Sequence, residues 1–187
     1  MAQWFLYFIF YSFAGYLLEK LYTRLTRSPN QVRKCFLLLP LCPVYGLAMT
    51  AVLAVIPEGT GLLLQMLLGG IICTSVEYLV HLFYEKTLHV FFWDYSGLRG
   101  HIRGRICPQF ALIWGVLSAA AVRQLQPFAA RMAAQTPPAI AFALWLLLAA
   151  DCVLTAALLR YVPNPEQLAW GAAFAQIRAS SQSSTSL

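Results

Sequence analysis

The sequence predicts an all-α, polytopic integral membrane protein with about five transmembrane helices. Hydrophobic residues make up 60% of the 187 residues and charged residues only 11%, whereas soluble globular proteins carry far more charge. Apolar runs of about 20 residues, the length needed to cross the hydrocarbon core of a bilayer, recur along the chain. Helices are the expected spanning elements because each satisfies its own backbone hydrogen bonds in lipid.

The expected helices cover residues 4–22, 36–56, 62–84, 108–122 and 139–161. The first has no basic residues at its start, so we interpret it as a retained helix and not as a secretory signal. Pro40 and Pro43 remove backbone donors, and the second helix is therefore expected to begin late or to be broken. The fourth is the weakest, because Gln109 and Arg123 leave only a short apolar core.

Lysine and arginine are distributed unevenly between the connections. The first and third connections and the tail hold most of the 13 basic residues, while the second, 57–61, holds none. Basic connections face the cytoplasm, so we expect residues 1–161 to form one transmembrane domain with the N-terminus outside. Residues 162–187 are then a cytoplasmic tail, disordered at its serine-rich end. The net charge of +6 follows from this distribution and does not indicate nucleic-acid binding.

The cysteines are scattered singly and form no CxxC pair, so neither a zinc cluster nor a disulfide framework is indicated. We interpret all five as small apolar residues: Cys35, Cys42, Cys73, Cys107 and Cys152. No Gly-rich phosphate loop is present either, which argues against ATPase activity within this chain. No cofactor is expected.

Ionisable side chains inside the expected helices are the first candidates for function, because each costs about 2.5 to 3.5 kcal/mol at the centre of a membrane helix. One face of the third helix carries a stripe of four polar residues at helical spacing: Thr74, Glu77, His81 and Glu85. Glu19 in the first helix and Asp151 in the fifth are further candidates.

Three interpretations of the stripe remain open. It could line a pathway for a solute or an ion, since His titrates near neutrality and burial raises the pKa of Glu toward it. A metal site could use Glu77 and His81, but no motif supplies the further ligands. In the structural alternative, Glu77 pairs with an arginine of the third connection and His81 donates to a carbonyl.

Segment 90–107, VFFWDYSGLRGHIRGRIC, is unusually polar for its position between two apolar helices. Its aromatic residues and arginines are typical of a membrane border. Its three glycines allow backbone conformations in which successive N–H groups cradle an anion or a carboxylate. Asp94 could cap a helix starting near Ser96 or hold an arginine fork. We expect a semi-ordered segment, re-entrant or interfacial, between the third and fourth helices.

The motif WDYS followed by GRIC, with P-x-x-P-V-Y-G and G-Y-x-x-E earlier in the chain, resembles the bacterial family of ABC-transporter type IV permeases. The resemblance covers roughly residues 7–126. It implies a small integral membrane protein of about five or six helices, located in the bacterial cytoplasmic membrane, whose substrate is mostly unestablished. The positions that match are Gly15, Glu19, Pro40, Pro43, Tyr45, Gly46, Glu77, Trp93, Asp94, Tyr95, Ser96, Gly104, Arg105 and Trp114.

These observations predict a small transporter or permease component for an unidentified solute or ion. A cytoplasm-facing polar cavity would be built from the first helix, the third helix and segment 90–107. We expect a homodimer, because five short helices enclose little volume, with membrane lipid and a separate ATPase or substrate-binding subunit as candidate partners. The candidate ligand or pathway residues are Glu19, Tyr45, Glu77, His81, Trp93, Asp94, Tyr95, Ser96, His101, Arg103, Arg105 and Asp151.

The charge of the solute stays open, since Arg103 and Arg105 favour an anion while Glu19 and Glu77, together with aromatic rings, suit a cation. Two other classes compete with transport. One is a membrane enzyme acting on a lipid or lipid-linked substrate through His81, His101 and the arginines, although no nucleophile is identifiable. The other is an assembly subunit without a ligand of its own.

Overall fold

A computed structural model of the chain describes residues 2–26 and 35–161, and every helix or strand in these residues is a helix, joined by irregular segments. The all-α prediction is confirmed for these residues. The elements, in order, are α1 (Ala2–Leu25), α2 (Pro43–Val55), α3 (Leu62–Leu88), α4 (Pro108–Ala120), the π-helical turn η1 (Ala121–Leu125), α5 (Gln126–Gln135) and α6 (Pro138–Tyr161). The predicted cytoplasmic tail, 162–187, lies outside the described residues.

Two helices of the described part are long and apolar enough to cross a membrane: α3, with 27 residues, and the stretch Pro138–Leu159 of α6, with 22. The expected five spans are not confirmed. Helices α2 and α4 have 13 residues each, which is shorter than the roughly 20 that a bilayer requires. Helix α1 has 24 residues, but polar side chains in its second half lower its hydropathy.

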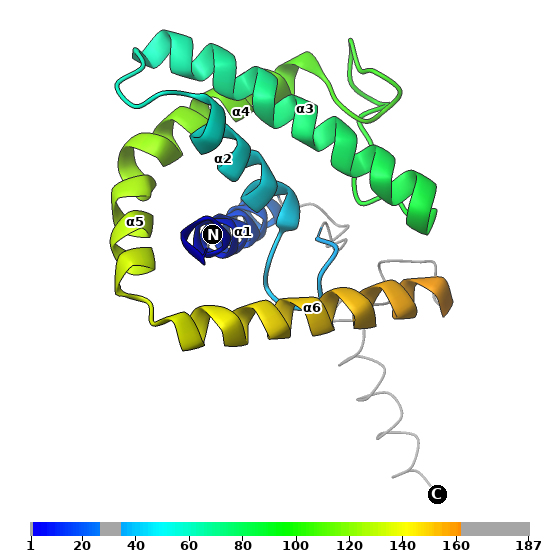
Figure 1. Cartoon of the computed structure of the whole chain (residues 1–187). Coiled ribbons are helices and arrows are strands. Elements are labelled where there is room, and N and C mark those ends of the chain that lie inside the picture. Colours follow the sequence, from blue (N-terminus) through cyan, green and yellow to red (C-terminus); the bar gives the residue numbers. More distant parts are fainter. Residues whose placement is uncertain (1, 27–34, 162–187) are drawn as a thin grey trace, which may run out of the picture.

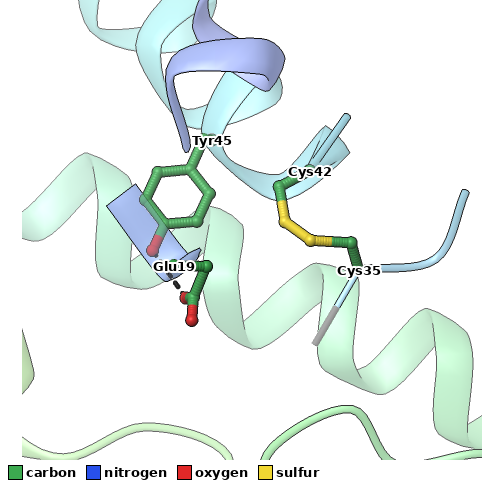
Figure 2. Close-up of a disulfide and its surroundings, with 4 residues drawn as sticks. All are labelled: Glu19, Cys35, Cys42 and Tyr45. Carbon is green, nitrogen blue, oxygen red and sulfur yellow. Dashed lines mark hydrogen bonds between the residues drawn. A yellow bond between two sulfur atoms is a disulfide. The ribbon is translucent and has the colours of Figure 1, made fainter. Parts of the chain in front are cut away.

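Helix α2 begins at Pro43, as the two prolines predicted, because a proline in the first turn of a helix removes only a donor that has no helical partner. The preceding residues, 35–42, form an irregular segment closed by a disulfide between Cys35 and Cys42, whose Cα atoms are 4.9 Å apart (Figure 2). The interpretation of these two cysteines as small apolar residues was therefore wrong. Their spacing of seven residues matches no short cysteine motif, so the sequence had no signal for the bond.

The helices pack closely through small residues. At Gly70 and Gly115, which face each other between α3 and α4, an added Cβ would come within 2.9 Å of the Ala111 carbonyl oxygen and 2.5 Å of the Met66 carbonyl oxygen. Helix α1 is viewed along its axis in Figure 1, with α2, α5 and α6 arranged around it. This packing brings the second half of α1, the start of α2 and the middle of α3 and α4 to one place.

Candidate functional site

A cavity of about 290 Å³ lies where α1, α2, α3 and α4 meet segment 90–107. Five of the predicted site residues line it: Glu19, Tyr45, Glu77, Trp93 and Tyr95. The other lining residues are apolar or aromatic and come from α1, α2 and α4: Leu18, Tyr22, Val44, Phe110, Ile113, Trp114 and Leu117. The packing therefore brings together predicted site residues that are separated by up to 76 positions, from Glu19 to Tyr95.

Glu77 is buried, with only 3% of its surface exposed. The Tyr95 hydroxyl donates to its Oε1 at 2.8 Å, and the Trp114 indole N–H donates to its Oε2 at 3.0 Å. Both donors are neutral, and none of the described residues forms an ion pair with Glu77. The alternative in which an arginine of the third connection pairs with Glu77 is therefore wrong.

Tyr95 is set in place by both its backbone and its side chain. Its N–H donates to the Gly104 carbonyl at 2.8 Å, and its ring stacks on Phe110 of α4 with the ring centroids 4.7 Å apart. Burial, followed by the nearby Glu77 charge, raises the pKa of Tyr95 well above its usual range. The hydroxyl therefore stays protonated and remains a donor to Glu77.

On the opposite wall, the Tyr45 hydroxyl donates to Oε1 of Glu19 at 2.7 Å, and Figure 2 shows the ring of Tyr45 directed toward that carboxylate. The same ring leaves no room for a side chain at Gly15 of α1. It also lies against Trp114, with the ring centroids 5.0 Å apart. Tyr45 thus connects the two carboxylates of the cavity: it binds Glu19 directly and contacts Trp114, which donates to Glu77.

Arg105 has a different partner from the ones expected. Its Nε and one terminal nitrogen donate to Oε2 of Glu85 at 2.8 and 2.6 Å, and the other terminal nitrogen donates to the Tyr78 hydroxyl at 3.1 Å. The hydrogen bonds that Arg105 donates to Glu85 raise the pKa of Arg105 above its usual value. Arg105 does not line the cavity, and its fork is held by Glu85 and not by Asp94.

Asp94 closes a turn within segment 90–107. Its two oxygens accept from the backbone N–H and the hydroxyl of Ser96, both at 2.8 Å, and these bonds hold the pKa of Asp94 below its usual range. Gly104 lies against it at φ +70°, where a Cβ would come 2.5 Å from the Asp94 Oδ1. Asp94 therefore caps a turn and not a helix: a helix starting near Ser96 was wrongly expected, since α4 begins only at Pro108.

The histidines also hold this segment. His81 Nε2 is 3.1 Å from the Trp93 carbonyl oxygen, as the structural alternative expected, while the Trp93 indole N–H donates to the Arg105 carbonyl at 3.0 Å. His101 Nδ1 accepts from the Gly104 N–H at 3.0 Å. Arg103 adopts φ +50° in the adjoining turn. Several backbone N–H groups that were expected to cradle an anion thus donate to acceptors of the same segment.

Asp151 of α6 lies away from the cavity. Its Oδ1 and Oδ2 accept from the backbone N–H groups of Leu38 and Leu39 at 3.2 and 3.1 Å. These amides belong to the irregular segment that the prolines keep out of α2, so Asp151 supplies acceptors that a helix would otherwise provide. Among residues 2–26 and 35–161, no three His, Cys, Asp or Glu side chains gather as a metal site would require.

Trp114 and Phe110 were absent from the predicted site, although Trp114 was noted as a family position. They lie four residues apart on α4 and, with Leu117, form a stripe at helical spacing that faces the cavity. That spacing was readable in the sequence. An apolar stripe is usually core, however, and only its contact with Glu77 distinguishes this one.

A family model described as "Putative ABC-transporter type IV" matches residues 6–156. The chain belongs to this family. The match confirms the resemblance and extends past residue 126, so that every candidate residue from Glu19 to Asp151 lies within it. No curated protein and no solved structure matches the chain.

For the ABC-transporter type IV family, the name itself points to a transporter-type membrane protein. Two helices of membrane-spanning length and apolar character, α3 and part of α6, are compatible with that location. Both lie almost wholly within the matched residues. In this member of the family, the middle of α3 carries the buried Glu77.

Proposed function

We propose that this chain is the membrane component of a transport system and that the cavity around Glu77 is its solute-binding site. The burial of Glu77 carries the proposal. An ionisable side chain inside an apolar, membrane-spanning helix is costly and usually faces a pathway or a ligand site. Glu77 lies in α3, is 3% exposed, and borders a cavity of about 290 Å³.

The size and composition of the cavity support a small solute. Ligand sites in proteins are concave and mostly apolar, with a few placed polar groups, and begin at about 300 Å³. Here the polar groups are two carboxylates and the hydroxyls and indoles that bind or face them. The hydrogen bonds from Tyr95 and Trp114 hold the Glu77 carboxylate in one orientation, as a preformed site requires.

Location and partners form part of the same proposal. Large apolar side chains are exposed along α6, among them Phe142, Trp145, Leu147 and Val153, which suits contact with lipid or with a second copy of the chain. We place the protein in the bacterial cytoplasmic membrane as a homodimer, with the N-terminus outside and segment 90–107 at the cytoplasmic border. A separate ATPase would supply the energy for transport.

The competing enzyme function gains no comparable support. His81, His101 and Asp94 each hydrogen-bond to a backbone group of segment 90–107. These hydrogen bonds give each of the three side chains a role in holding the segment. The transport proposal therefore uses the residues that the fold brings to one cavity.

Uptake by cells of the source organism tests the proposal with all native partners present. Cells lacking the gene would be complemented with the wild-type chain, Glu77→Gln or Glu58→Gln. Glu58 is an exposed carboxylate between α2 and α3 and does not line the cavity. Depletion of each solute from a defined mixture of amino acids, amines, sugars and organic acids is measured by mass spectrometry.

We expect at least one solute to be taken up with the wild type and Glu58→Gln but not with Glu77→Gln. Equal amounts of the three chains in the membrane fraction show that the loss is one of function. Identical uptake of every solute with and without the gene would refute the transport proposal.

A further inference from the structure

We propose that the solute is a small organic cation, an ammonium group attached to an apolar body, held between the Glu77 carboxylate and the aromatic rings of the cavity. This inference rests on the proposed function of the cavity as a solute site. It decides the sign of the solute charge, which the sequence left open.

The charge of the site comes from Glu77. Each oxygen of an ionised carboxylate has about two lone-pair sites, and each oxygen of Glu77 accepts one hydrogen bond, from Tyr95 or from Trp114. Both donors are neutral, so the ionised form of Glu77 has no counter-ion among the described residues. A cationic ligand would supply that counter-ion.

The described residues that line the cavity include no lysine, arginine or histidine. The arginine that could have served an anion, Arg105, is taken by Glu85 at 2.6 Å outside the cavity. Among the described lining residues, an anion would therefore meet carboxylates of its own sign and no cation. That arrangement selects against anions.

Half of the lining residues are aromatic: Tyr22, Tyr45, Trp93, Tyr95, Phe110 and Trp114. The faces of such rings attract ammonium groups, most strongly where water is excluded. Inorganic divalent cations prefer six or more oxygen ligands, and an aromatic and aliphatic wall cannot supply them. The lining thus favours an organic cation over a metal ion.

A second cavity of about 350 Å³ continues the first on its apolar side. The two cavities share four wall residues: Leu18, Tyr45, Trp114 and Leu117. The second is lined mainly by small and apolar residues of α1, α2, α3 and α4, such as Ala14, Ala48 and Met49. A cation with an apolar extension would place its ammonium group near Glu77 and its extension toward this space.

Binding to purified protein in lipid nanodiscs tests the inference with three probes of one shape. Choline is cationic, 3,3-dimethylbutan-1-ol is its neutral analogue, and 3,3-dimethylbutanoate is the corresponding anion. Equilibrium dialysis measures binding of each. We expect choline to bind about tenfold more tightly than the alcohol, and the anion to bind least. Replacing choline by butyltrimethylammonium should tighten binding further.

The variants separate charge from ring contact. Glu77→Gln should abolish the preference for choline, and Glu58→Gln should preserve it. Phe110→Leu removes a ring but no charge, so it should weaken choline several-fold and leave the alcohol nearly unchanged. Because this second variant removes neither the Glu77 carboxylate nor its two donors, Tyr95 and Trp114, it tests the inference even if Glu77→Gln fails to fold.

Equal or tighter binding of the alcohol or the anion would overturn the inference, as would no measurable choline or butyltrimethylammonium binding at millimolar concentrations. These results would not refute the transport proposal, since uptake of a neutral or anionic solute could still depend on Glu77. Conversely, selective choline binding together with gene-independent uptake of every solute would refute the transport proposal and uphold the cation site.

Discussion

Replacing Tyr95 with phenylalanine removes one hydrogen-bond donor from Glu77 and leaves the ring in place. The Tyr95 hydroxyl is the donor to Oε1, at 2.8 Å, while Trp114 serves Oε2. Loss of a hydrogen bond to a charged group costs about 1.5 to 3 kcal/mol. Hydrogen bonds within membranes average nearer 0.6 kcal/mol, because the unfolded chain also finds partners there.

We expect the larger value. Glu77 is 3% exposed, and the substitution leaves a buried carboxylate oxygen without its protein donor. Tyr95 lies in segment 90–107, outside the apolar part of α3. In the unfolded state its hydroxyl is therefore nearer to water than a group inside the membrane, and the lower membrane value applies less well to it. The predicted loss in the free energy of unfolding for Tyr95→Phe is therefore about 1.5 to 3 kcal/mol.

Reversible unfolding in mixed micelles, followed by circular dichroism, measures this loss. Tyr16→Phe is the matched control, since the ring of Tyr16 lies 5.7 Å from Lys20 Nζ and phenylalanine preserves that contact. Trp114→Phe and the double variant complete a cycle. The two losses should couple, because the same carboxylate loses both donors. A Tyr95→Phe loss within about 0.5 kcal/mol of the control would refute the reasoning.

Three further predictions concern the frame around the cavity. The pKa of Asp94 is lower in the folded segment than in the unfolded chain. Its ionised form therefore stabilises the folded segment at pH values above the usual aspartate pKa of about 3.9. This contribution is lost as the pH falls through the pKa of the folded state. Protection of segment 90–107 from hydrogen exchange, relative to the intrinsic rate at each pH, should therefore decrease below about pH 4 in the wild type but not in Asp94→Asn, and an equal decrease in both would contradict this role. Gly115→Val should destabilise by about 1 to 3 kcal/mol, because its Cβ would lie 2.5 Å from a carbonyl oxygen of α3; Gly61→Ala, which has open space, should be near neutral, and equal effects would count against the close packing. Cys35 and Cys42 should resist maleimide under denaturing conditions until a reductant is added, and modification of both by maleimide added at lysis, before any reductant, would disprove the bond.

The cysteine experiment also bears on orientation. The basic residues predict that the connection containing Cys35 faces the cytoplasm, whereas stable disulfides form mainly in oxidising compartments. A bond already present in intact cells would place this connection outside and reverse the proposed orientation. Thiols that are free in cells and pair only after lysis would agree with the distribution of lysine and arginine.

Much of the local structure could be predicted from the chain alone. Composition and apolar run length predict helices, Pro40 and Pro43 predict the late start of α2, and helical spacing places Glu77 and His81 on one face of α3. Each of these features depends on residues within a few turns of one another, where backbone sterics and periodicity act directly. The length of a run did not predict a span in every case, because α2 and α4 stop at 13 residues.

What only the tertiary structure decided is which partners these residues have. Glu77 meets Trp114, 37 positions away, and Asp151 meets the amide of Leu38, 113 positions away. Arg105 binds Glu85 and not Glu77 or Asp94, the carboxylates expected from the sequence. Such pairings depend on how closely helices approach at Gly15, Gly70 and Gly115 and on the path of segment 90–107. The sequence by itself thus determined helices and a polar stripe on one face of α3, while helix packing, which periodicity does not encode, enclosed one carboxylate of that stripe in an aromatic cavity.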